Sequence, residues 1–135
     1  MLEILLAVIY SLVVVQGIKG ITESFKRKKL EIKNFYKTGG MPSSHAAVVS
    51  ALALSIYYIE GLSTGFIISL VLAMIVMRDA MGVRRTVGEE VIVLRKLLRK
   101  HRLRSKVHDA PGHTPLQVIF GALVGVSVTV LMHAL

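Results

Sequence analysis

The sequence predicts an all-α integral membrane protein, a helical bundle with four transmembrane helices and one amphipathic interfacial helix. Two observations support this fold class. First, 53% of the 135 residues are hydrophobic, which is more than an ordinary soluble domain contains. Second, all 17 Lys and Arg residues fall into two segments, residues 19–37 and 78–106. Apolar stretches separated by basic loops are typical of a protein that crosses the membrane several times.

The chain is predicted to form one membrane domain, residues 1–135. Its apolar stretches give spans of about one membrane length or slightly less. The predicted spans cover residues 2–18, 43–59, 62–77 and 114–135, and the basic loops cover 19–42 and 78–113. No basic residue precedes the first apolar stretch, so we expect a retained anchor rather than a cleaved signal peptide.

Small residues indicate close helix contacts in two of these spans. Ala47, Ala51 and Ser55 recur every four residues in the second span, and Gly121 and Gly125 form a GxxxG spacing in the last. Small side chains let helix backbones approach each other inside a membrane. We therefore interpret both patterns as packing surfaces rather than as parts of an active site.

The second basic loop contains an amphipathic segment, residues 89–104. Val91, Leu94, Leu97 and Leu98 share one face of a helix there, and basic residues surround the rest. A basic amphipathic helix of this kind is typical of one that lies along an anionic membrane surface.

The two basic loops also predict the orientation of the chain. Four spans put both loops on the same side, and the positive-inside rule assigns that side to the cytoplasm. We expect a multi-pass protein of the cell membrane with both termini on the opposite side. The beginnings of the second and last spans then share the cytoplasmic face, so residues from the two loops can meet.

The net charge of +9 favours contact with an anionic partner. Nucleic acid is not expected, because the chain has no recognisable binding motif and few aromatic residues among its basic residues. A phosphorylated small molecule or lipid, together with the membrane itself, fits better. With zero cysteines the chain has no thiolate metal site, and we expect no metal and no cofactor.

The stretch TGGMPSSHAA, residues 38–47, predicts an anion site at the start of the second span. The amides of Gly39 and Gly40, the hydroxyls of Ser43 and Ser44, and the ring of His45 come together at a helix N-terminus. Free amides and the helix dipole favour an anion at such a place.

His113 stands in the corresponding position at the start of the last span. Histidine titrates near neutral pH, so a facing pair can supply a nucleophile, an acid or a base. A helix cap or a contact with a lipid headgroup is the alternative for either histidine taken alone. We therefore interpret His45 and His113 together as a functional site.

The segment RDAMGVRR, residues 78–85, supplies candidate phosphate ligands. The planar guanidinium group suits phosphate oxygens, and we favour Arg84 and Arg85 as substrate contacts. Arg78 and Asp79 are further candidates, with mutual ion pairing at the interface as the alternative.

Three segments of the chain resemble the divergent, membrane-bound branch of the type 2 phosphatidic acid phosphatase superfamily, which is related to acid phosphatases and vanadium haloperoxidases. These segments are PSSHAA, RDAMGVRR and GHTPLQVIFGALVG. The resemblance covers nearly the whole chain. It implies that residues 42–45 correspond to a PSGH motif, which supplies phosphate-binding groups and a general-acid histidine, His45, with Ser44 in place of glycine. It also implies that His113 is the nucleophile.

The chain departs from the superfamily pattern behind this histidine. The superfamily has an orienting aspartate four residues after the nucleophile, where Gln117 stands here. Gln117 can hold the tautomer of the ring but carries no charge to stabilise an imidazolium, unless Asp109 or Asp79 compensates. Val107 stands where the superfamily has an arginine, so Arg84 or Arg85 would take over the role of that arginine. Lys19 is a candidate for the first conserved lysine of the superfamily pattern.

The leading hypothesis is a membrane phosphatase that hydrolyses a phosphate or diphosphate ester, with a lipid-linked ester as one candidate, through a phosphohistidine intermediate. The alternative is a non-catalytic membrane protein that binds phosphorylated lipid or assembles with partners, which Gln117 and the small number of spans favour. A transporter subunit has less support, because no span carries a charge at mid-depth. Since four helices form a thin bundle, we expect a homo-oligomer.

Overall fold

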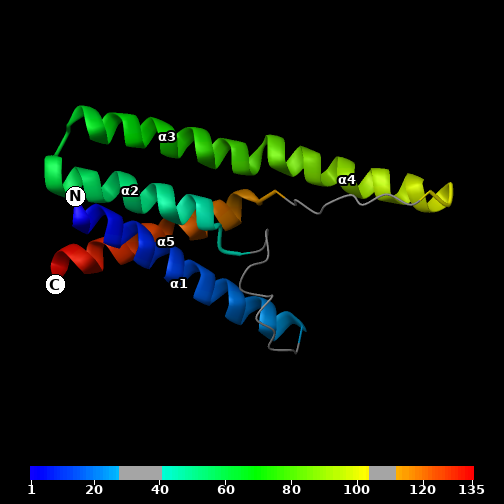
Figure 1. Ribbon diagram of the computed structural model, residues 1–135, viewed down its shortest axis with the longest axis horizontal. Coiled ribbons are helices and arrows are strands. Elements are labelled where there is room, and N and C mark those ends of the chain that lie inside the picture. Colours follow the sequence, from blue (N-terminus) through cyan, green and yellow to red (C-terminus); the bar gives the residue numbers. More distant parts are fainter. Residues whose placement is uncertain (28–40, 104–111) are drawn as a thin grey trace.

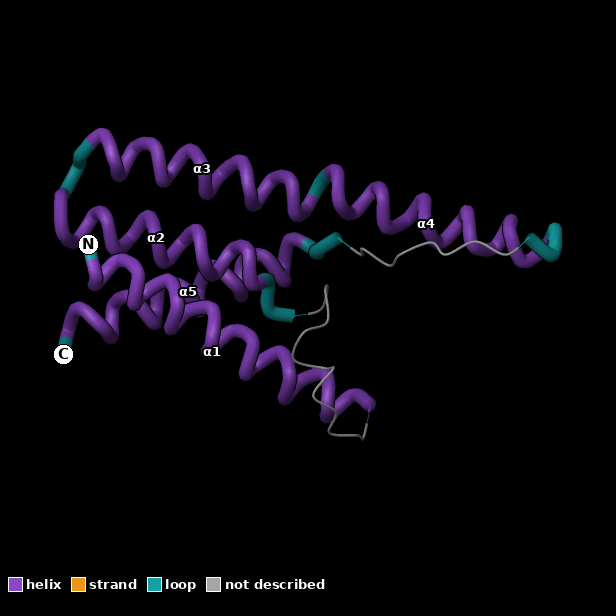
Figure 2. Tube along the Cα trace, viewed as in Figure 1, coloured by secondary structure: helices purple, strands orange, loops and turns teal. Residues whose placement is uncertain are grey.

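The computed structural model describes residues 1–27, 41–103 and 112–135. In chain order the helices are α1 (Leu2–Arg27), α2 (Ser44–Glu60), α3 (Thr64–Met81), α4 (Val83–Lys100) and α5 (Pro115–Ala134). The bundle consists of α1, α2, α3 and α5, and α4 continues beyond it (Figure 1). The described ranges contain no strand (Figure 2). The all-α fold class is therefore confirmed.

The helices have the length and surface of a membrane bundle. The helical stretches Leu2–Phe25, Thr64–Lys100 and Pro115–Ala134 are each long and apolar enough to cross a membrane. The apolar helix α2 is shorter, with 17 residues. Many large apolar side chains are exposed on the outside, among them those of Val13, Ile75 and Leu131. Lipid can cover such side chains, whereas contiguous apolar patches on this scale are rare on soluble monomers.

Helix α2 lies at the centre of the bundle and packs against α1, α3 and α5. It can do so because its inward positions are small. The side chains of Ala47, Ala51 and Ser55 are all fully buried, as their spacing predicts. Helix α5 packs closely against α2, since a Cβ atom on Gly121 would collide with the carbonyl oxygen of Ser43, and one on Gly125 with that of Ala47. The GxxxG pair is therefore a packing surface.

Polar side chains begin three of the helices. The hydroxyl of Ser43 accepts a hydrogen bond from Ala46 N at the start of α2, and Ser63 does the same for Phe66 N at the start of α3. Thr114 caps α5 by accepting from Gln117 N at 3.4 Å. These caps satisfy amides that have no partner within the helix. Two of the capping residues, Ser43 and Thr114, lie within two residues of His45 and His113.

Two helices have different ends from those suggested by the apolar pattern. Helix α1 continues past residue 18 to Arg27, because charged residues such as Lys19 and Glu23 are good helix formers. The amphipathic helix α4 covers 83–100 rather than 89–104. It begins after Gly82, whose backbone leaves the helical region (φ −97°, ψ −98°), and it ends before Arg102, which is left-handed (φ 54°).

Candidate functional site

The rings of His45 and His113 face each other, with centroids 6.4 Å apart and planes tilted by 58°. His45 lies in the first turn of α2, and His113 lies two residues before α5. The two residues differ in accessibility, because His113 is only 6% exposed whereas His45 is exposed. The structure thus brings together the two histidines that the sequence pairs.

Backbone contacts with α2 and α3 fix the start of α5. The amide of Ser43 donates to the carbonyl oxygen of Gln117 at 3.0 Å, and the amide of His113 donates to that of Ala80 at 2.9 Å. Ala46, Ala80 and Val118 form a buried apolar cluster underneath. The position of His113 is therefore set by α2 and α3 together, at the same end of the bundle as His45.

The side chain of Gln117 determines the tautomer of His113. Its Oε1 atom lies 3.2 Å from Nδ1 of His113 and accepts a hydrogen bond of 3.0 Å from the amide of Thr114. A backbone amide can only donate, so the atom between the two must be the amide oxygen. Because that oxygen can only accept, Nδ1 of His113 carries the proton. A neutral His113 ring then has its lone pair on Nε2.

The two predicted arginines lie at the start of α4, and each is paired with an acid. Arg84 Nε is 2.6 Å from Asp79 Oδ2, and Arg85 Nε is 3.1 Å from Glu89 Oε1. These ion pairs are largely exposed to solvent, so each is worth little and can exchange for another anion. Arg78 is also exposed.

The loop before α5 touches this part of α4 directly. A Cβ atom on Gly112 would collide with the backbone of Arg84 and Arg85, so only glycine allows the observed approach. An open groove of about 170 Å³ lies between α4 and residues 112–114, and His113 and Arg85 are among its lining residues. The start of α4 therefore forms one wall beside His113.

Lys19 of α1 is part of the same neighbourhood. It is only 6% exposed, which is unusual for a lysine. Lys19, Arg84 and Asp79 all lie close enough to His45 to interact electrostatically with its ring. The hydroxyl of Thr22 donates to the carbonyl oxygens of Lys19 and Met41 and so ties α1 to the segment before α2.

The two serines of the PSSH segment have different surroundings. Ser43 is fully buried, and its hydroxyl serves the α2 cap. The hydroxyl of Ser44 is buried without a hydrogen-bond partner among the described residues. A buried polar atom of this kind is costly unless a water or a ligand satisfies it. Among the described residues, the hydroxyls of Ser11 and Ser55 share this state.

Some predicted site residues lie outside the described ranges, namely Gly39, Gly40 and Asp109. Within the described ranges, no three His, Cys, Asp or Glu residues are grouped in a way that could hold a metal ion.

Sequence reasoning missed three features of the site. One is the double role of Thr114, which caps α5 with its hydroxyl and orients Gln117 with its amide; the spacing Thr-x-x-Gln is a capping-box signal that could have revealed it. The others are the bond from His113 to Ala80 and the close approach of Gly112 to α4. Both depend on tertiary packing, so no local sequence pattern predicts them.

Comparison with known proteins supports the resemblance. Residues 2–128 match the model of the Divergent PAP2 family. The chain is also 32% identical over 145 residues to the "uncharacterized membrane protein YuiD" of Bacillus subtilis (strain 168), with 95% of this chain and 92% of the relative covered. No solved structure shows a significant match. The chain is thus a membrane protein that belongs to the Divergent PAP2 family.

Proposed function

We propose that the protein is a membrane phosphatase that hydrolyses a phosphate or diphosphate ester through a phosphohistidine intermediate. The observation that carries this proposal is the 6.4 Å separation of the His45 and His113 rings. An attacking nitrogen needs to be about 3 to 3.5 Å from its target, and a proton donor about 2.6 to 3.2 Å from the oxygen it protonates. A phosphoryl group between the two rings meets both requirements with small side-chain adjustments.

In the first step Nε2 of His113 attacks phosphorus with its lone pair. The bond between phosphorus and the ester oxygen breaks, and a protonated His45 gives its proton to that oxygen, so the alcohol leaves neutral. His113 can begin this step because Nδ1 carries the proton. The resulting phosphohistidine keeps that proton on Nδ1, in the hydrogen bond to Gln117 Oε1.

In the second step water replaces the histidine. His45, now neutral, takes a proton from the water as the oxygen attacks phosphorus, and the bond between phosphorus and Nε2 breaks. Inorganic phosphate leaves, and both histidines return to their starting protonation states. The scheme uses no metal and no cofactor.

The surrounding side chains would hold the phosphate oxygens. We assign this role to the buried Lys19, to the unpartnered hydroxyl of Ser44, and to Arg84 and Arg85 after exchange from Asp79 and Glu89. Pre-arranged positive groups in a poorly hydrated site stabilise charge that develops in the transition state. Gly39 and Gly40 would add backbone amides. Ser43 would support the start of α2, since its hydroxyl is fully buried in the cap.

The positive-inside rule assigns the site to the cytoplasmic face. It also assigns both termini to the opposite side. A site at the membrane surface is suited to a lipid-linked ester, because the phosphate can reach the histidines while the chains stay in the bilayer.

Phosphate release by the purified protein in lipid nanodiscs tests the proposal. A panel of lipid phosphates and diphosphates should include at least one substrate, and His113→Ala should abolish its turnover. His101→Ala is the matched control, because His101 is exposed beyond the end of α4, and it should keep the wild-type rate. Equal turnover by wild type and His113→Ala would rule the mechanism out.

A second candidate function is phosphate-lipid binding without turnover. Gln117 favours it, because an uncharged side chain behind His113 gives an imidazolium no electrostatic support. In this case vanadate or a lipid phosphate would bind to the folded protein, while no phosphate would be released and no acid-labile phosphohistidine would accumulate.

A further inference from the structure

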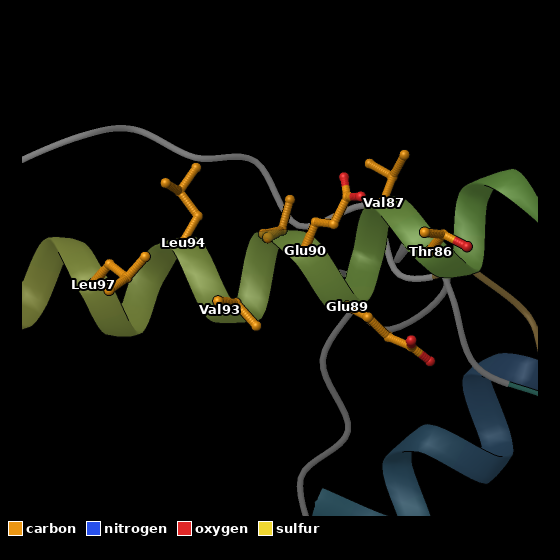
Figure 3. A pocket seen from close by; sticks show the side chains of 8 residues that line it. Thr86, Val87, Glu89, Glu90, Val93, Leu94 and Leu97 are labelled. Carbon is orange, nitrogen blue, oxygen red and sulfur yellow. The ribbon is translucent and has the colours of Figure 1, made fainter.

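The outer side of α4 is apolar, and none of the other described helices covers it. At 100° per residue, six apolar residues fall on one side of this helix: Val83, Val87, Val91, Leu94, Leu97 and Leu98. No residue of α4 is buried. Figure 3 shows Val87 and Leu94 pointing to one side of α4, whereas Glu89 points to the other. Exposed apolar surface of this size signals a partner.

The opposite side of α4 faces the candidate active site. The groove beside His113 is lined from α4 by Arg85, Gly88, Glu89 and Ile92. These residues fall on the helix side that is opposite to the apolar face. The apolar face is therefore turned away from residues 112–114.

Charge identifies the partner. The segment 83–103 contains seven basic residues and only two acidic ones, Glu89 and Glu90. Most of the basic residues lie beside or opposite the apolar face, namely Arg84, Arg85, Arg95, Lys96, Arg99 and Lys100, with Arg102 beyond the helix. Glu90 falls within the apolar face itself (Figure 3), but the seven basic residues outnumber the two acidic ones, so the helix as a whole complements a bilayer with anionic headgroups.

We propose that α4 docks on an anionic bilayer surface through its apolar face by bending outward at Gly82. Gly82 separates two helices that otherwise continue in nearly the same direction (Figure 1). It has no side chain, and its backbone has already left the helical region. Because the apolar face points outward, an outward bend brings that face down onto the lipid.

A second copy of the chain fits this face less well. Two copies inserted in the same orientation would have α4 helices that leave the membrane on the same side and run parallel. The acidic residues 89–90 of each copy would then lie beside each other, and so would the basic residues 95–100. Like charges at matched positions oppose such pairing.

Site-directed fluorescence tests the docking without any measurement of activity. The chain contains no cysteine, so single variants can be labelled cleanly. Leu94→Cys places an environment-sensitive dye on the apolar face, and Ile92→Cys places the same dye on the opposite side; the two residues are 45% and 56% exposed. Each labelled protein is measured at one and at two copies per nanodisc, in zwitterionic and in anionic lipid.

In anionic discs we expect the emission of the dye at position 94 to shift to the blue and that of the dye at position 92 to shift little or not at all. High salt should reverse the shift at position 94, because it screens the headgroup charges. Three results would overturn the proposal: no shift at position 94 in anionic discs, an equal shift in zwitterionic discs, or a shift that requires two copies per disc. The last would assign the face to a second copy. None of these results depends on phosphatase activity, so the docking and the proposed function can fail separately.

Discussion

Gln117 accepts hydrogen bonds from two directions, one from the ring of His113 and one from the amide of Thr114. The second bond matters because it prevents the amide group from turning its NH₂ end toward the ring. The side chain thus performs one task of an orienting carboxylate, control of the tautomer, without supplying charge. In the proposed reaction, the effect of the tautomer and the effect of the missing charge can be measured separately with variants of Gln117.

Gln117→Glu should accelerate phosphoryl transfer. The substitution keeps the length of the side chain and both accepted hydrogen bonds, and it adds a negative charge beside a ring that becomes positive during the reaction. We expect a gain in kcat of about tenfold or more, equivalent to about 1.4 kcal/mol of barrier. Steady-state phosphate release measures it. Gln117→Leu, which removes the hydrogen-bond acceptor, should be slower than wild type. If Gln117→Glu were as slow as Gln117→Leu, the missing negative charge behind His113 would not be what limits the rate.

His45→Ala should affect poor leaving groups more than good ones. An alkyl alcohol needs a proton as it departs, whereas p-nitrophenolate is stable without one, so the proposed acid matters only for the first. We expect the loss of rate to be at least about tenfold larger for an alkyl phosphate than for p-nitrophenyl phosphate. His113→Ala should abolish turnover of both substrates. Equal losses in the His45 variant would remove the role of acid from this residue.

Lys19→Met should weaken the binding of phosphate analogues. The substitution keeps an unbranched side chain but removes the buried charge near His45. A hydrogen bond to a charged group contributes about 1.5 to 3 kcal/mol, so the inhibition constant for vanadate should rise by about ten- to a hundredfold. Lys96→Met on the exposed side of α4 is the control and should leave it unchanged. An unaltered constant in the Lys19 variant would place this lysine outside the phosphate site.

Gly121→Ala should push α2 and α5 apart. The new methyl group would meet the carbonyl oxygen of Ser43, and overpacking of this kind costs about 1 to 3 kcal/mol. We expect a lower unfolding temperature together with reduced phosphate release, because the same contact positions both histidines. Gly17→Ala is a matched control, since nothing lies within 4 Å of a Cβ atom there. If both variants were equally stable and active, the close contact would not support the site.

The sequence predicts the helices and the meeting of His45 and His113 because both follow from one-dimensional signals: apolar length, loop charge, and a histidine at the start of each of two helices. The small-residue positions are equally readable, since Gly121 can serve only a close contact or a break. What the sequence does not reveal is which side of α1 faces inward. The resemblance makes Lys19 only a candidate for the superfamily's first lysine, and it is the rotation of α1 that buries its side chain near His45. The direction of α4 is hidden for the same reason, because it depends on the backbone of Gly82.

The central position of α2 has a consequence for biosynthesis. Its neighbours α1 and α5 also contact each other, although α2, α3 and α4 separate them in the chain. His113 directly precedes α5, and α5 contains Gln117 and the glycines that fit against α2, so the first three membrane helices contain His45 without its partner. During synthesis the two histidines can meet only once α5 has entered the bilayer and packed against α1 and α2. Assembly of the site is therefore a late event in membrane insertion.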